Sequence, residues 1–190
     1  MNDEYDYQSI FDKYKHDVNI VTKSRNWYTQ QILLMNSRNI KESKLFVGSK
    51  TVKRLMPGKL YLYYYDPKYK ATLPFYDRFP LVFPYHADSN SFIGLNMHYL
   101  SYFFRIKLMT ILMRFATNTK LNENTRLNYS WQALNGMAQH QLAEKAIHKY
   151  LIGHVKSTFI EIPANQWHTA LMLPVERFVK SSKINVWGNL

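Results

Sequence analysis

The hydrophobic positions along this chain change their period twice. Residues 5–36 have helical spacing, and residues 37–59 are polar and basic, which predicts a surface loop. From residue 60 onward the spacing approaches two, and three short strands are predicted in 60–66, 79–86 and 92–99. Residues 101–153 return to helical spacing. Two more strands are predicted in STFIEIP (157–163) and WHTALMLP (167–174), followed by a short helix in VERFVKSS (175–182).

Local signals refine this outline. The segment ADSNS (87–91) has the composition of a turn between two strands. Pro84 lies inside a predicted strand, which favours an edge position or a bulge. Gly94, in the next strand, marks a bulge or a close approach of another backbone segment. The segment 101–115 is apolar on nearly every side, so we expect it to be buried within the helical insertion or against a partner subunit.

Five short strands suffice for a small antiparallel barrel, which limits exposed strand edges. We therefore predict an α+β protein: an SH3-like antiparallel β-barrel with flanking helices and a helical insertion at about 101–153. Residues 1–36 would form an acidic N-terminal arm and helix. Residues 37–190 would form a single barrel domain, with 67–79 as a long loop between its first two strands.

Charge adds a hint about partners. The 190 residues carry a formal net charge of +12, and 16% of them are aromatic. The first 17 residues carry five acidic residues against two lysines, or −3, so the remaining residues carry +15. An acidic arm on a basic body can fold back on it, contact a neighbouring subunit or simply be solvated. The basic body suits a polyanion or an acidic protein surface.

Several chemistries are absent from the sequence. There is no cysteine, which excludes disulfides and thiol catalysis. The common nucleotide-binding, zinc-protease and hydrolase motifs do not occur, and the seven histidines show no metal-ligand spacing. We therefore expect a protein that is not an enzyme and holds no cofactor or metal. We also expect no signal peptide and no membrane span, because the start is acidic and the segment 99–115 carries three basic residues.

The stretch PGKLYLYYYDPKYKATLPFYDRFPLVFPY (57–85) combines tyrosines, prolines and lysines. Nine basic residues lie between positions 38 and 70, opposed by only two acidic ones. Interleaved with tyrosines, they suit a groove that tracks phosphates and stacks bases. The alternative is solvated lysines with about half of the tyrosines in the core. The candidate phosphate-binding residues are Lys50, Lys53, Arg54, Lys59, Lys68 and Lys70.

The stretch 56–85, then FIGLNMHYL (92–100) and LMLPVERFVKSSKINVW (171–187), resemble a family of small proteins of T4-like tailed bacteriophages. The shared forms are P-G-x-(L/M)-Y, Y-x-P-K, L-P-x-Y-D-x-F-P-L-V, G-x-N-x-H-Y-L and L-P-x-E-x-F. The resemblance covers most of residues 56–187 and leaves out the acidic arm. Members carry the labels of virion, tail or DNA-associated proteins, so the resemblance implies a structural protein of a phage.

Taken together, these features favour a non-enzymatic structural protein of the virion, in the tail or baseplate, assembled in the host cytoplasm and contacting several other virion proteins. A tryptophan near the C-terminus either anchors in a partner's pocket or folds back on its own domain. The alternative function is a DNA-binding head, neck or DNA-end protein that uses the basic, tyrosine-rich surface. The candidate partner-docking residues are Tyr69, Phe75, Tyr76, Arg78 and Trp187.

Overall fold

The computed structural model describes residues 49–101, 104–105, 108–109, 112, 114, 118–138, 141–172 and 175–188. The predicted arm and helix of residues 1–36, and most of the predicted loop 37–59, lie outside the described residues. The boundary between the two predicted segments therefore stays a prediction.

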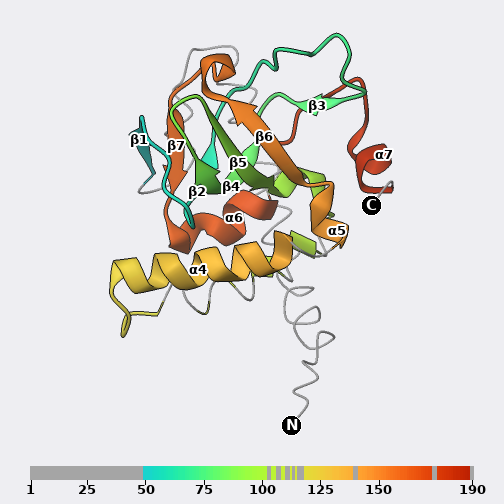
Figure 1. Cartoon of the computed structure of the whole chain (residues 1–190). Helices are drawn as coiled ribbons and strands as arrows, with labels where there is room; N and C mark the ends of the chain where they lie inside the picture. Colours follow the sequence, from blue (N-terminus) through green and yellow to red (C-terminus); the bar gives the residue numbers. More distant parts are fainter. Residues whose placement is uncertain are drawn as a thin grey trace.

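The described strands form two antiparallel sheets (Figure 1). The larger sheet has six strands in the order β1-β7-β2-β4-β5-β6, and the smaller one pairs β3 with β8. The strands are β1 (Lys50–Val52), β2 (Leu60–Leu62), β3 (Tyr76–Asp77), β4 (Leu81–Ala87), β5 (Ser91–Asn96), β6 (Ile147–Leu151), β7 (Phe159–Ile162) and β8 (Phe178–Val179).

Helices connect and cover these strands. In Figure 1, α6 and α4 lie beneath the large sheet, and α7 lies near the small sheet at the C-terminal end. The described helices are the short 3₁₀ turns η2 (Met97–Tyr99), η3 (Ile152–His154) and η4 (Ala164–Gln166), and the α-helices α4 (Glu123–Ala138), α5 (Gln141–Glu144), α6 (Trp167–Met172) and α7 (Lys183–Gly188).

The alternation in KLYLYYYD produces two hydrophobic clusters. Leu60 and Leu62 point toward the larger cluster, which also includes Trp167 of α6. Tyr61 and Tyr63 belong to a separate cluster with other aromatic side chains. Both tyrosines are fully buried, because successive side chains of a strand point to opposite faces and both faces of β2 are covered here.

The turn and bulge signals of the sequence are confirmed. Asp88 lies in the turn between β4 and β5, where its carboxylate accepts hydrogen bonds from the backbone N–H groups of Asn90 and Ser91 at 2.7 and 2.6 Å. Pro84 lies opposite Gly94, and the pairing register shifts immediately after it. A Cβ at Gly94 would lie 2.8 Å from the Phe83 carbonyl oxygen and would collide with Val82. Only glycine fits this approach.

The barrel prediction is wrong. Among the described strands the large sheet is open: β1 and β6 lie at its edges, and no pairing joins these two strands. Helices and loops cover its faces, so its apolar side chains are buried without closure of the sheet. What stands is the coarser fold class, a mixture of helices and antiparallel strands.

Five elements also differ from the predicted ones. Residues 147–151 form β6 rather than the end of a helix, so the helical insertion ends before it. Residues 167–172 form helix α6 rather than a strand, because Trp167, Ala170 and Leu171 have helical spacing and pack into the core. Part of the predicted final helix is strand β8. The predicted loops 37–59 and 67–79 contain the short strands β1 and β3.

Most of the described residues in the basic, apolar segment after Ser101 are buried, whereas Phe104 is half-buried and Arg114 is exposed. Arg105, Leu108 and Leu112 have no exposed surface. The Arg105 guanidinium donates to the backbone carbonyls of Leu100, Leu171 and His98 at 2.8, 2.9 and 3.0 Å, which satisfies its buried charge. The buried part of this segment therefore packs against its own chain, and its contacts reach residues outside the predicted insertion.

Candidate nucleic-acid interface

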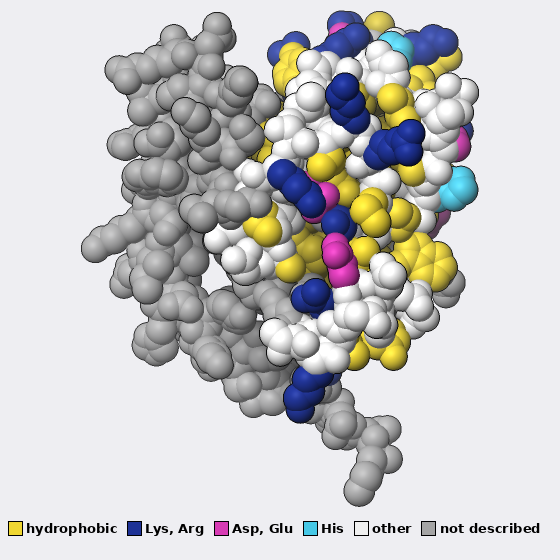
Figure 2. All heavy atoms as spheres, turned by 90° about the vertical axis from the view of Figure 1, so that its left-hand side faces the viewer, with side chains coloured by type: hydrophobic (Ala, Val, Ile, Leu, Met, Phe, Trp, Pro, Cys, Tyr) yellow, Lys and Arg dark blue, Asp and Glu magenta, His cyan; other side chains and the backbone are white. Residues whose placement is uncertain are grey.

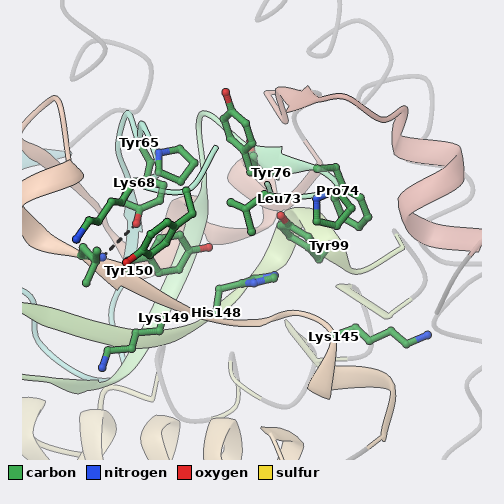
Figure 3. Close-up of a pocket in the computed structure, with 15 residues that line it drawn as sticks. Tyr65, Lys68, Leu73, Pro74, Tyr76, Tyr99, Lys145, His148, Lys149 and Tyr150 are labelled. Atoms are coloured by element: carbon green, nitrogen blue, oxygen red, sulfur yellow. Dashed lines mark hydrogen bonds between the residues drawn. The ribbon is translucent and has the colours of Figure 1, made fainter. Parts of the chain in front are cut away.

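A loop and a strand form a pocket on one side of the large sheet. The loop spans residues 67–75 and follows the Tyr65–Val155 bridge, and the strand is β6. Between them lies a cavity of about 440 Å³ (Figure 3). We call it the aromatic pocket. Its lining consists of Tyr65, Pro67, Lys68, Tyr69, Leu73, Pro74, Phe75, Tyr76, Asp77, Tyr99, Lys145, His148, Lys149, Tyr150 and Leu151.

Backbone turns and one lysine hold the loop in place. The backbone N–H groups of Thr72 and Leu73 both donate to the Tyr69 carbonyl at 3.0 Å. The Nζ atom of Lys180 donates to the carbonyls of Lys70, Ala71 and Leu73 at 2.8, 2.8 and 3.0 Å. Lys180 has a φ of 68°, which non-glycine residues rarely adopt. The C-terminal segment thus fixes the wall of the pocket that the loop forms.

Aromatic rings form much of the pocket wall. Tyr150 of β6 contacts Tyr65 edge to face, with ring centroids 5.0 Å apart. Tyr99 packs against the ring of His148 at 4.1 Å. Phe75, half-buried, lies 5.9 Å from Tyr99. Such edge-to-face and tilted contacts fix the orientation of the rings that line the pocket.

A buried carboxylate lies at the inner end of the pocket. Asp77 is 3% exposed, and its Oδ2 atom lies 2.7 Å from His98 Nδ1. Its Oδ1 atom accepts from the backbone N–H groups of Phe79 and Arg177, both at 3.0 Å. Burial by itself would raise the pKa of Asp77, but His98 and these two donors outweigh it and lower the pKa. The inner end of the pocket therefore carries an ionised carboxylate.

His148 contributes a neutral ring. Burial lowers the pKa of His148 to about 4, against the opposing effects of Asp77 and the Lys145 backbone. Its Nε2 atom is buried and has no hydrogen-bond partner among the described residues. At neutral pH, His148 therefore adds no positive charge to the pocket.

Lysines surround the opening of the pocket. Lys68, Lys145 and Lys149 are exposed, and Figure 3 shows their ammonium groups directed away from the rings. We call them the rim lysines. The Nζ atom of Lys68 lies 5.3 Å from the centre of the Tyr69 ring, and Tyr69 is 61% exposed. Aromatic surface and positive charge are thus adjacent, the combination that binds unpaired bases together with their phosphates.

The predicted docking residues lie partly at this pocket. Tyr69, Phe75 and Tyr76 line it, although Tyr76 is only 8% exposed. Arg78 is exposed, and its guanidinium lies 5.8 Å from the centre of the Tyr64 ring. Trp187 is half-buried and donates from Nε1 to the His98 carbonyl at 2.8 Å, so its ring packs on its own domain. A partner-docking role for these residues stays a prediction.

The six predicted phosphate-binding residues form two groups. Lys68 and Lys70 lie on the pocket loop, where Lys70 forms an ion pair with Asp66 at 3.0 Å. The second group lies at β1 and the start of β2, and we call this surface the β1 face. It comprises Lys50, Lys53, Arg54 and Lys59.

The basic residues of the β1 face differ in ion pairing and exposure. Lys59 forms ion pairs with Glu161 and Glu123, both at 3.2 Å. Burial disfavours the charge of Lys59, but these carboxylates outweigh it and raise its pKa. Lys50 also contacts Glu161, at 3.3 Å, while Lys53 and Arg54 are exposed. Figure 2 views the molecule from the β1 side and shows more basic than acidic side chains across this surface.

The sequence interpretation missed the contribution of β6. The helical spacing predicts a helix through Lys145, His148, Lys149 and Tyr150, and none of these four is among the predicted site residues. The segment IHKYL does carry a usable signal, because its β-branched and aromatic residues are typical of a strand. A strand at this position would have placed Lys149 and Tyr150 on opposite faces of a sheet.

Other kinds of site find no support in the described part of the chain. No three His, Asp or Glu side chains among the described residues lie close enough together to hold a metal ion. None of the described helices has the length and apolar character needed to cross a membrane.

Comparison with known protein families gives a match. The model of the family described as the phage T4 terminal DNA protecting protein matches residues 6–189. No curated protein and no solved structure matches the chain. The match confirms the resemblance to proteins of T4-like phages. The prediction of a tail or baseplate protein is wrong, because the description of the family names protection of DNA termini. The chain belongs to the family of the phage T4 terminal DNA protecting protein.

Proposed function

We propose that this protein binds the ends of linear phage DNA and shields them from exonucleases. The observation that carries the proposal is the aromatic pocket, about 440 Å³ in volume and bordered by the rim lysines, in a chain with a net charge of +12. The description of the family, a terminal DNA protecting protein, supports the same function. This replaces the tail or baseplate hypothesis with the DNA-end alternative.

The mechanism is occlusion, and no bond is made or broken. Exposed cations of the β1 face and the rim bind backbone phosphates and release counterions, which gives affinity without sequence preference. Rings of the aromatic pocket stack against a base at the terminus. An exonuclease must engage the same terminal nucleotide, so a bound protein excludes it.

The shape of the site favours DNA ends over the body of a duplex. A base within the duplex is stacked on both sides and can enter a pocket only by being flipped out, which costs a few kcal/mol. A terminal nucleotide has a neighbour on one side only and leaves the stack more easily. A concave pocket bordered by phosphate-binding groups therefore selects termini.

The proposal also places the protein with phage DNA in the virion. Binding to the packaged DNA end would carry the protein into the particle without a tail attachment. Contacts with other virion proteins through Arg78 or the exposed part of Trp187 would be additional to DNA binding.

The test is protection of a linear duplex from an exonuclease that degrades DNA from its ends. We expect the purified protein to slow degradation strongly. The double substitution Lys68→Ala/Lys149→Ala should weaken end binding about tenfold, or about 1.4 kcal/mol, because it removes two rim charges. Lys120→Ala, which removes one exposed charge outside the pocket, serves as a control for the loss of positive charge elsewhere.

Two results would contradict the proposal. One is an unchanged rate of degradation at saturating protein. The other is equal affinity for linear and covalently closed circular DNA of the same length, which would indicate general coating rather than end binding.

A further inference from the structure

We propose that the aromatic pocket takes the base of one unpaired terminal nucleotide, while the rim lysines hold its phosphate outside. This inference rests on the proposed function and specifies which form of DNA end the protein recognises. It predicts that ends with an unpaired or frayed nucleotide bind more tightly than ends whose last base pair stays closed.

The size of the pocket supports a single nucleotide. Its volume of about 440 Å³ lies near the lower end of the range for small-molecule sites, about 300–1,000 Å³. A closed terminal base pair brings two bases joined edge to edge and two backbones. Such a pair can rest on the rim but cannot enter a cavity of this size.

The arrangement of rings supports a flat ligand. Tyr99 and Tyr150 form inner walls and are 6% and 5% exposed, so they are held in place by packing. Tyr69, 61% exposed, lies at the outer edge on the loop that Lys180 fixes. An exposed tyrosine at the opening of a ring-lined cavity offers a base one stacking surface as it enters.

The distribution of charge sets the orientation of the nucleotide. The inner end holds the ionised carboxylate of Asp77, whose oxygens already accept hydrogen bonds from its neighbours. A phosphate there would meet a like charge in a poorly hydrated environment. The rim lysines direct their ammonium groups outward (Figure 3). The base therefore points inward and the phosphate stays at the opening.

The first experiment compares two linear duplexes that differ only at the terminus. One ends in a single unpaired nucleotide, and the other has its terminal base pair closed by a covalent interstrand cross-link. We expect the unpaired end to bind about 5- to 150-fold more tightly, which corresponds to the range of about 1–3 kcal/mol for stacking of one base on an aromatic side chain. A closed circular duplex serves as the reference for binding away from ends.

The outcomes separate this inference from the proposed function. If both linear duplexes bind equally well and the circle binds more weakly, end binding stands and the nucleotide pocket is overturned. If the circle binds as well as both linear duplexes, the proposed function itself fails.

The second experiment locates the nucleotide. A 5-iodouracil base at the unpaired terminal position is cross-linked by light, and the attachment site is mapped by mass spectrometry. We expect attachment to Tyr69 or another tyrosine of the pocket, and no such attachment when the label lies well inside the duplex. Attachment of the terminal label at the β1 face, outside the pocket, would overturn the inference.

Matched variants complete the test. Tyr69→Ala should remove most of the preference for the unpaired end, and the exposure of its side chain means that the fold should be retained. Tyr129→Ala, on α4 and 39% exposed, removes a tyrosine outside the pocket and should keep the preference. A preference for the unpaired end that is equally strong in both variants would refute the assignment of Tyr69 as a stacking surface.

Discussion

At the residue scale, the lining of the aromatic pocket includes two buried ionisable groups, one held in its charged form and the other in its neutral form. Asp77 is ionised because His98 and backbone N–H donors stabilise its charge. His148 is neutral because burial disfavours its charged form. The neutral ring packs against Tyr99 at 4.1 Å and so forms part of the aromatic wall. Both groups link the stability of the pocket to pH.

His148 leads to a prediction about stability. Its pKa falls from 6.5 to about 4 on folding, so between these values the unfolded chain binds a proton that the folded chain does not. The contribution of His148 to the free energy of unfolding is fully present above about pH 6.5 and is lost as the pH falls toward 4. Between about pH 7.5 and about pH 5 it should decrease by about 2 kcal/mol.

Urea unfolding at the two pH values measures this loss. His148→Phe keeps a flat ring beside Tyr99 but cannot titrate. Between the two pH values, the free energy of unfolding of this variant should therefore fall by about 2 kcal/mol less than that of the wild type. Equal pH dependence in both proteins would show that His148 is not responsible.

At the element scale, the β4–β5 pair lies in the interior of the large sheet and contains an irregularity. Pro84 has no backbone N–H to donate, and the pairing shifts directly after it, so the bulge accommodates a proline in an interior strand. Gly94 permits this because a side chain there would collide with Val82 and the Phe83 backbone. The two residues form one structural unit across the two strands.

Alanine substitution of two glycines tests this description. Gly94→Ala should destabilise the protein by about 1–3 kcal/mol, the cost of forcing extra atoms into a packed site. Gly153→Ala is the matched control, since a Cβ there meets nothing within 4 Å and should change stability by at most about 0.5 kcal/mol. Thermal or urea unfolding compares the two. A Gly94→Ala protein as stable as Gly153→Ala would contradict the close approach.

At the scale of the whole molecule, the proposed function uses two groups of positively charged side chains, the rim lysines and the β1 face. In the proposed function these surfaces differ in role: the β1 face binds phosphates anywhere along DNA, and the rim acts where a terminus is present. Lys59 contributes least to DNA binding because two carboxylates already neutralise it. Lys53 and Arg54 are the exposed members of the β1 face and should contribute most.

This division predicts two separable effects on DNA binding. Lys53→Ala/Arg54→Ala should weaken binding to linear and circular DNA equally. It should also reduce the slope of log affinity against log salt by about 0.9 for each phosphate that the variant no longer neutralises. Lys68→Ala/Lys149→Ala should mainly reduce the preference for linear DNA. Affinity measured over a series of salt concentrations checks both. A β1-face variant that loses end preference alone would contradict the division.

The sequence by itself determined the features that depend on neighbouring residues. Strands β2, β4, β5 and β7, the turn at Asp88 and the Pro84–Gly94 irregularity follow from local spacing and backbone preference. The absence of cysteine, the excess of positive charge and the resemblance to a phage family could also be read from the chain. The alternation of Leu60–Leu62 predicted two faces, although not that both are buried.

The tertiary structure decided the features that depend on distant segments. Whether the sheet closes depends on what covers its faces, and helices far along the chain do so here. The segment IHKYL becomes a strand because it pairs with β5, which local helical spacing could not reveal. The aromatic pocket brings Tyr69 and Lys68 together with Lys149 and Tyr150, about eighty positions apart in sequence. Only folding places these rings and charges around one cavity, because no local pattern encodes a contact between them.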